Sequence, residues 1–365
     1  MVLSILLFPQ LKPLSSSTPV TAFEFHKGIN ISAWLSQTGM NASEMAAYFT
    51  KKDFDQLASI GFDHLRLPLD EKYLYNNDGS RNAETFTLIH NVIGWCKEAN
   101  MRVILDCHDL KISRNLKPNK NQKVTLWESK EEQDNFVQLW KKLSGEFKKY
   151  PNTLVAYELL NEPVAPTPEE WNLLSARVIS ELRQLEPLRI LFLGSNKFNS
   201  VTTFPELKVP PGDPNIILSF HFYHPGLLTH YTVATFENNE TGIDIPLNYP
   251  GRLIPTEKIK GTLTPKQQET IKVQQGTFNR ERLLEKMENV LKKAKETGLR
   301  IHCGEFGSNF KYPDHDLQLR WMQDLIANFK SKNIPYSVWG YRKSFGVFDD
   351  NRAIKDQRYL DAIVK

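Results

Sequence analysis

The residues best suited to chemistry are two glutamates, Glu162 and Glu305, and each closely follows an apolar run typical of a buried strand. Glu162 comes after Leu154–Leu160, and Glu305 comes after Arg300–Gly304. Paired carboxyl groups hydrolyse glycosidic bonds, because one protonates the leaving oxygen while the other stabilises or attacks the anomeric carbon. Enzymes that retain the anomeric configuration hold the two groups roughly 5–5.5 Å apart. We predict that Glu162 is the acid/base and Glu305 the nucleophile.

Polar side chains at other predicted strand ends fit the same chemistry. Arg66 and Tyr223 are expected to reach Glu305, where a cation and a phenol donor would hold it as an anion. Asn161 is expected to donate a hydrogen bond to the sugar hydroxyl beside the reacting carbon, and that bond would strengthen in the transition state. These residues would therefore keep Glu305 ionised, as a nucleophile requires, rather than protonated as a second acid.

The surroundings of Glu162 differ. Its neighbour Pro163 suggests partial desolvation, which would raise the pKa of Glu162 and let it carry the proton. His221 is predicted to tune that proton, and Trp339 to offer a flat apolar platform for a sugar ring. His108 is expected to lie at the same rim, on the substrate side.

Positioning these side chains requires a scaffold, and the chain alternates short apolar runs with longer amphipathic stretches. That alternation is typical of βα units and a parallel sheet. The predicted strands are Phe25–Ile31, His64–Pro68, Arg102–His108, Leu154–Leu160, Ile190–Gly194, Ile216–Tyr223, Arg300–Gly304 and Tyr336–Trp339. Eight strands indicate a (β/α)8 barrel in a single catalytic domain, residues 24–365. The alternative, a doubly wound nucleotide-binding sheet, needs a glycine-rich turn where this chain reads Ser32-Ala-Trp-Leu35.

The helix signals agree with this order. Capping boxes are expected at Asn41 with Glu44 and at Thr167 with Glu170, and Gly298 is expected to close a long helix that begins near Arg280. Residues 224–277, after the sixth strand, show little periodicity. They are predicted to form a long loop insertion that walls a substrate cleft.

These residues as a set resemble glycoside hydrolase family 5, the cellulase-type retaining β-glycanases. The resemblance runs from about Lys27 to Val364. Its anchors are Gly28-Ile-Asn-Ile-Ser-Ala-Trp34, Arg66-Leu-Pro68, His108, Leu159-Leu-Asn-Glu-Pro163, His221-Phe-Tyr223, Gly304-Glu-Phe-Gly307 and Trp339. It implies double displacement through a glycosyl-enzyme on Glu305, with Arg66, His108, Asn161, His221, Tyr223 and Trp339 as the supporting residues. Trp34 and Trp127 are further candidates for contact with sugar.

Substrate preference is the most open prediction, because the resembled family acts on cellulose, mannan, mixed-linkage glucan, xyloglucan and 1,3-glucan. We expect an endo-β-1,4-glucanase. A β-mannanase, or an exo- or endo-glucanase on β-1,3 or mixed-linkage glucan, is the alternative. Transglycosylation shares the glycosyl-enzyme, and a non-catalytic carbohydrate-binding barrel is a remote alternative that loss of one glutamate would indicate.

The composition limits the classes of binding partner and cofactor that we expect. The 365 residues carry a formal net charge of +4, and no basic stripe is interleaved with aromatics, so no nucleic acid is expected. The three cysteines form no C-x-x-C pair, and neither a metal nor another cofactor is implied. We expect a monomer whose partner is a β-glucan or a related oligo- or polysaccharide.

The N-terminus offers two interpretations. Residues 1–23 combine a short apolar run, a Ser/Thr/Pro stretch and Val20-Thr-Ala22, which resembles a cleavage site, but the positively charged start of a signal peptide is missing. They are predicted to be a tail or a signal peptide, and the protein to be secreted or periplasmic. No apolar run is long enough to span a bilayer.

Overall fold

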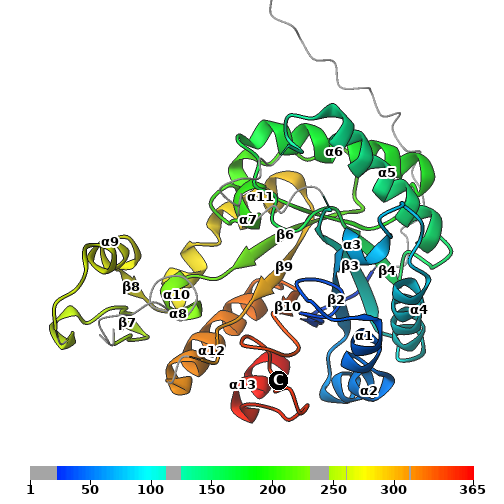
Figure 1. Ribbon diagram of the computed structural model, residues 1–365. Coiled ribbons are helices and arrows are strands. Elements are labelled where there is room, and N and C mark those ends of the chain that lie inside the picture. Colours follow the sequence, from blue (N-terminus) through cyan, green and yellow to red (C-terminus); the bar gives the residue numbers. More distant parts are fainter. Residues whose placement is uncertain (1–22, 112–124, 231–245, 260, 312–313) are drawn as a thin grey trace, which may run out of the picture.

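The computed structural model describes residues 23–111, 125–230, 246–259, 261–311 and 314–365. In these residues, eight parallel strands close a barrel in the order β1-β10-β9-β6-β5-β4-β3-β2, with helices around it (Figure 1). The barrel strands are β1 (Lys27–Asn30), β2 (His64–Asp70), β3 (Arg102–Asp109), β4 (Val155–Glu158), β5 (Leu191–Gly194), β6 (Ile216–Phe222), β9 (Arg300–Phe306) and β10 (Tyr336–Val338). The eight predicted strands and the (β/α)8 class are confirmed.

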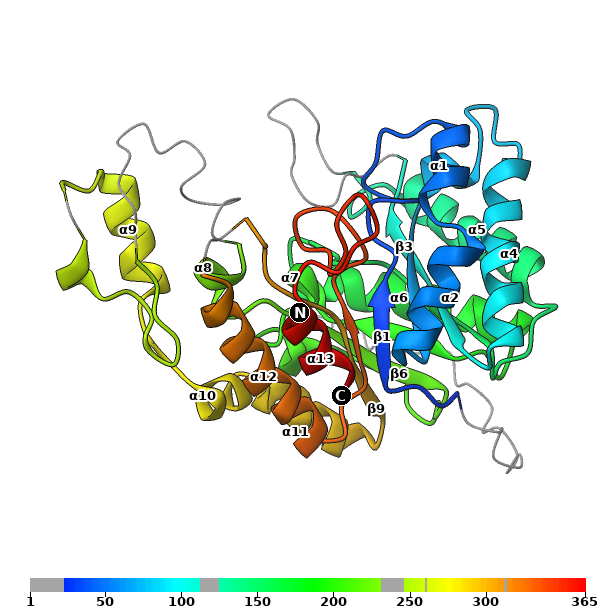
Figure 2. The ribbon, with the colours of Figure 1, turned by 90° about the horizontal axis from the view of Figure 1, so that it is seen from below.

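Helices follow most of the barrel strands (Figures 1 and 2). The longer ones are α1 (Ala42–Tyr48), α2 (Lys51–Ile60), α4 (Ala83–Glu98), α5 (Lys130–Phe147), α6 (Pro168–Leu185), α9 (Pro265–Gln274), α10 (Arg280–Glu285), α11 (Glu288–Thr297), α12 (His315–Ser331) and α13 (Gln357–Val364). Single turns form α3 (Glu71–Leu74), α7 (Asn196–Asn199), α8 (Gly226–Thr229), η1 (Phe204–Glu206) and η2 (Thr256–Lys258).

Local sequence explains where several helices begin and end. Asn41 and Glu44 form the predicted capping box of α1, and Thr167 and Glu170 form that of α6. Gly298 ends α11 in the left-handed conformation, with φ 70°. The single long helix predicted before Gly298 is wrong, however, because α10 and α11 are separate helices that break at residues 286–287.

Burial explains the strand pattern. All seven residues of β2 are buried, as expected of a parallel sheet that is covered on both faces. A second apolar cluster includes Phe23, Phe25 and Phe192, whose rings pack against one another. Phe25 also packs edge-on against His64 at the start of β2 and His302 near the start of β9, so this cluster plugs the N-terminal end of the barrel. The polar strand ends are left at the opposite mouth.

The insertion after β6 contains more structure than predicted. Helix α9 and a two-stranded antiparallel sheet, β7 (Gly251–Arg252) with β8 (Thr277–Phe278), lie beyond α8 on one side of the barrel (Figures 1 and 2). Tyr249 joins this unit to α12, because its hydroxyl donates to Asp324 over 2.7 Å and its carbonyl accepts from Arg320 over 2.9 Å. The prediction of a loop without secondary structure is therefore wrong for 246–259 and 261–277, and residues 231–245 lie outside the described residues.

The other predictions concern cysteines and membranes. Cys96, Cys107 and Cys303 are buried free thiols, as expected. Among the described residues, no helix has the length and apolar character that crossing a membrane requires. The tail or signal peptide predicted for residues 1–23 lies, except for Phe23, outside the described residues.

Candidate active site

The two glutamates meet at the mouth of the barrel. Glu162 lies four residues beyond the end of β4, and Glu305 lies within β9. Their nearest carboxyl oxygens are within 4.8 Å of one another. The backbone of Glu162 has φ 47°, a left-handed conformation that costs roughly 1–3 kcal/mol in a non-glycine residue and that clusters at functional sites.

Both oxygens of Glu305 accept a hydrogen bond. Arg66 Nη1 donates to Oε1 over 2.8 Å, and the Tyr223 hydroxyl donates to Oε2 over 3.0 Å. The side chain of Glu305 is 6% exposed. Burial and the carboxylate of Glu305 raise the pKa of Tyr223 well above its usual value, so Tyr223 stays protonated and remains a donor. The structure thus brings Arg66 and Tyr223 to the glutamate predicted to be the nucleophile.

Arg66 is the centre of a buried network of carboxylates. Its Nε donates to Glu158 Oε2 over 2.7 Å, and its Nη2 lies 3.0 Å from Asp106 Oδ2. The same Nη2 donates to Asn161 Oδ1 over 2.9 Å. The guanidinium is fully buried, and opposite charges this close keep it ionised despite that burial. Arg66 thus holds the oxygen of Asn161, and the amide nitrogen of Asn161 lies 3.4 Å from His108 Nε2.

Glu162 has a different environment. Its Oε1 lies 2.8 Å from His221 Nδ1, and its side chain is 16% exposed. Burial raises the pKa of Glu162 to about 7, although the charges of His108 and Arg66 work in the opposite direction. Burial also lowers the pKa of His221, so its ring is neutral near pH 7. With a pKa near 7, Glu162 is protonated in about half of the molecules at neutral pH, which suits the proton-donor role predicted for it.

His108 and Trp339 form one face of the mouth. Their rings stack with centroids 5.6 Å apart and planes 9° apart, and the Trp339 side chain is only partly buried. His108 Nδ1 lies 2.7 Å from Asp106 Oδ2. Burial favours the neutral ring, but Asp106 raises the pKa of His108 to about 9. His108 is therefore a second cation in the network.

Two predicted sugar-binding tryptophans are not brought to this mouth. Trp34 is 1% exposed, its indole nitrogen donates to Met45 O over 2.8 Å, and its ring packs on Phe49. The structure therefore corrects its assignment from sugar contact to core packing. Trp127 is 7% exposed and packs edge-on against Trp171, so little of its indole surface is open to a sugar ring.

Besides Asp106, other polar residues that the sequence analysis did not assign belong to the network. Asn30 Oδ1 accepts from Arg66 Nη1 over 2.8 Å, and Gln37 Nε2 lies 3.0 Å from His108 Nε2. Glu158 is 1% exposed, and burial raises the pKa of its carboxyl group although Arg66 lowers it. Alternation along β1 could have indicated Asn30, whereas Gln37 lies in a turn without a periodic pattern.

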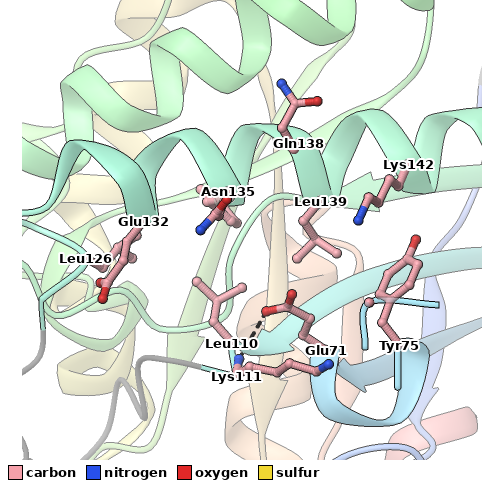
Figure 3. Close-up of a pocket in the computed structure, with 12 residues that line it drawn as sticks. Glu71, Tyr75, Leu110, Lys111, Leu126, Glu132, Asn135, Gln138, Leu139 and Lys142 are labelled. Carbon is pink, nitrogen blue, oxygen red and sulfur yellow. Dashed lines mark hydrogen bonds between the residues drawn. The ribbon is translucent and has the colours of Figure 1, made fainter. Parts of the chain in front are cut away.

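Two hollows lie near these residues. One, of about 390 Å³, is lined by Ala33, Gln37, Thr38, Gly39, Met40, Glu44 and Lys343, and its Gln37 also contacts His108. The other, of about 180 Å³, lies between α3, α5 and the end of β3 (Figure 3). Leu110, Leu126 and Leu139 are among its lining residues, and Lys111 N donates to Glu71 Oε2 at its edge. It includes none of the predicted catalytic residues.

Glu162, His221 and Glu305 are also close enough to hold a metal ion, since one atom of each lies within 4.8 Å of the others. The donor chemistry fits a metal poorly, because a metal ligand must offer a lone pair. His221 Nδ1 and Glu162 Oε1 lie at hydrogen-bond distance, which places a proton between them. Arg66 and Tyr223 occupy both oxygens of Glu305 as donors. The geometry of the trio is consistent instead with the roles predicted for it, in which Glu162 is the acid, His221 its partner and Glu305 the nucleophile.

Comparison with known proteins agrees with this geometry. A model of the cellulase family, glycosyl hydrolase family 5, matches residues 26–344. The chain belongs to this family. Glycosyl hydrolase family 5 members are glycoside hydrolases, and the chain is therefore an enzyme that cleaves glycosidic bonds.

Relatives in the family span nearly the whole chain. Endoglucanase C of Acetivibrio thermocellus is 28% identical over 355 residues, which cover 93% of this chain and 98% of that protein. Cellodextrinase A of Ruminococcus flavefaciens is 27% identical over 325 residues, covering 88% of this chain and 84% of that protein. The solved structure of Thermotoga maritima Cel5A with cellobiose has a TM-score of 0.72 at 20% identity, covering 93% of this chain and 97% of that one, and it shows the same fold.

Proposed function

We propose that this glycoside hydrolase is a retaining endo-β-1,4-glucanase that acts by double displacement. The observation that carries the mechanism is the separation of the two carboxyl groups. Their nearest oxygens lie within 4.8 Å, which suits direct attack by one carboxylate. Inverting enzymes place the groups roughly 6.5–9.5 Å apart to leave room for a water molecule.

The chemistry follows from the unequal surroundings of the two groups. In the first step Glu305 attacks the anomeric carbon, while Glu162 gives its proton to the departing glycosidic oxygen. This forms a glycosyl-enzyme and releases the shortened sugar chain. In the second step ionised Glu162 takes a proton from water, the hydroxide attacks the anomeric carbon, and Glu305 leaves as a carboxylate. Arg66 and Tyr223 orient Glu305 through both steps.

The substrate assignment rests on the relatives. Those that match nearly the whole chain are named as an endoglucanase and a cellodextrinase, both enzymes of β-glucan. The partly exposed face of Trp339, stacked beside His108, supplies the kind of platform on which the apolar face of an equatorial sugar ring packs. We propose that a β-1,4-glucan occupies this mouth and is cleaved internally, and that the enzyme is a monomer secreted or held in the periplasm, where such polymers are accessible.

A substrate panel tests the assignment. Carboxymethyl cellulose, barley glucan, mannan, xylan and laminarin are compared, with product lengths and viscosity recorded. We expect the highest rate on a β-1,4-linked glucan, with a fall in viscosity that precedes the release of short sugars. A clear preference for mannan or laminarin, or release of a single short product from the start, overturns the substrate proposal but leaves the mechanism in place.

The mechanism has its own test. Glu305→Gln is expected to abolish hydrolysis of an aryl β-cellobioside, and Glu186→Gln is the matched control, because Glu186 is another buried glutamate whose partners are Tyr157 and Arg189. NMR of the first product should show the β-anomer. Wild-type protein without activity on any substrate indicates a binding barrel, an α-anomer indicates inversion, and products that carry added acceptor sugars indicate transglycosylation.

A further inference from the structure

Asn199, a residue outside the predicted catalytic set, is held against the histidine that contacts the acid/base. It ends α7, the short segment after β5, where Lys197, Phe198 and Asn199 all have positive φ values of 55°, 69° and 50°. Three such residues in a row cost roughly 1 kcal/mol or more each, so the surrounding structure must enforce them. The consequence is that Phe198 is 44% exposed, whereas Asn199 is completely buried.

The segment is tied to the chain that follows Glu162. Asn196 Oδ1 accepts from Ala165 N over 2.8 Å, Asn196 Nδ2 donates to Ala165 O over 3.1 Å, and Phe198 N donates to Pro163 O. The backbones that carry Asn199 and Glu162 are therefore fixed relative to one another. This arrangement holds the Asn199 amide in place without any contribution from substrate.

The side-chain amide of Asn199 has one polar partner. Its Nδ2 lies 3.4 Å from His221 Nε2, a contact in which an amide nitrogen can only donate, while its Oδ1 has no hydrogen-bond partner among the described residues. The fit is close, because a Cβ built on Gly194 would lie 2.2 Å from Asn199 Oδ1, and one built on Gly304 would lie 3.3 Å from His221 Nε2. Two glycines thus make the space in which the amide and the imidazole meet.

The contact decides where the proton of His221 lies. A neutral imidazole carries one N–H, and the hydrogen bond at one nitrogen fixes the role of the other. If Nε2 accepts from Asn199, then Nδ1 carries the proton and donates to Glu162 Oε1, 2.8 Å away. Oε1 is then occupied as an acceptor, and the acidic proton of Glu162 resides on Oε2.

We propose that Asn199 is a positioning residue that selects the tautomer of His221 and, through it, the oxygen of Glu162 that carries the catalytic proton. This inference rests on the proposed function, since it assigns Glu162 as the acid. The other tautomer would place a bare nitrogen against Glu162, which would bind the acidic proton and withhold it from the glycosidic oxygen. Asn199 therefore contributes to the step in which the leaving group needs that proton.

The test uses substrates that differ in their need for an acid. The 2,4-dinitrophenolate of a 2,4-dinitrophenyl β-cellobioside leaves without protonation. Departure of the leaving group of a 4-methylumbelliferyl β-cellobioside depends more on protonation by the acid. For Asn199→Leu we expect kcat/KM to fall about tenfold on the methylumbelliferyl substrate, as loss of one hydrogen bond implies, and less than about threefold on the dinitrophenyl substrate. Asn172→Leu is the control, because Asn172 is another buried asparagine, bonded to the backbone at Glu206 and Lys208.

A second variant keeps the inference testable if Asn199→Leu fails to fold. Asn199→Asp preserves the shape but accepts from Nε2–H and favours the imidazolium form of His221. That cation beside Glu162 should move the alkaline limb of the kcat/KM profile about one pH unit below that of the wild type. Equal losses on both substrates, or a pH profile of Asn199→Asp that matches the wild type, overturns the inference. Neither outcome changes what is expected of the wild-type activity or of Glu305→Gln. Failure of the proposed function would appear in those two experiments and can therefore be distinguished from failure of this inference.

Discussion

Replacing Arg66 by methionine should destabilise the protein in a way that depends on pH. The fully buried guanidinium neutralises three carboxylates, those of Asp106, Glu158 and Glu305, at 2.7–3.0 Å. Removing one partner of a buried ion pair costs about 3–5 kcal/mol, because the other charge stays buried without compensation. At about 2 °C per kcal/mol for a chain of this size, Arg66→Met should lower Tm by about 6–10 °C at pH 7.

The pH dependence follows from the same charges. Burial already raises the pKa of the Glu158 carboxyl group, and without Arg66 its pKa in the folded state would lie still further above that in the unfolded state. The folded variant then binds more protons than the unfolded chain between those values, so its stability falls as pH rises. Each such carboxyl group contributes about 1.4 kcal/mol per pH unit within that interval. The loss of stability of Arg66→Met relative to the wild type should therefore be small near pH 4 and largest at pH 7 and above.

Thermal unfolding followed by circular dichroism from pH 4 to pH 8 measures this deficit. Arg183→Met is the matched control, because Arg183 forms a buried pair with one carboxylate, Asp213, far from the catalytic glutamates in the sequence. The control should lose stability with a shallower pH dependence and keep its activity. A deficit for Arg66→Met that is constant with pH, or no steeper than that of Arg183→Met, would refute the shared-charge reasoning.

Three further outcomes are expected. Because Glu162 must be protonated and burial raises its pKa to about 7, kcat/KM should fall as pH rises through about 7; a plateau up to pH 9 contradicts this assignment. Trp339→Ala should lower kcat/KM about five- to tenfold, because it removes an aromatic platform for sugar. Trp34→Ala should instead lower Tm and leave KM unchanged, because Trp34 is buried in the core. Equal effects of the two variants on KM would argue against both assignments. EDTA should leave the rate on carboxymethyl cellulose unchanged, because His221 Nδ1 is engaged with Glu162; a loss that a divalent ion restores would show a metal site.

The barrel was predictable because its strands are buried along their length. Runs such as His64–Pro68 and Ile216–Tyr223 are apolar enough to be recognised without knowledge of their partners, and each carries a polar side chain at or near its C-terminal end. In a closed parallel barrel all such ends meet at one mouth, so the order of strands was sufficient to group Arg66, Asn161, His221 and the two glutamates.

The insertion was harder to predict because its stability does not come from a periodic apolar face. Among the side chains of α9 that the structure describes, Gln267 and Ile271 are the buried ones, so hydrophobic spacing gave no helix signal. The signal that was present is local: Thr264 and Gln267 form a capping box, with Pro265 at the first helical position. Sequence patterns likewise could not separate Trp34 in the core from Trp339 at the mouth, because burial of one indole depends on tertiary contacts.

The unequal roles of the two glutamates arise from where the barrel places its cations. Arg66 projects from β2 and is shared among Asp106, Glu158 and Glu305, so the carboxylate on β9 has a cation at 2.8 Å. Glu162 lies beyond the end of β4 and contacts the neutral ring of His221 instead. A buried carboxyl group without a cation in contact favours its protonated form. Glu162 is therefore protonated because the network gives it no cation in contact, and a cation introduced at position 221 should lower the pKa of Glu162, so that it loses its proton at lower pH without either carboxyl group moving.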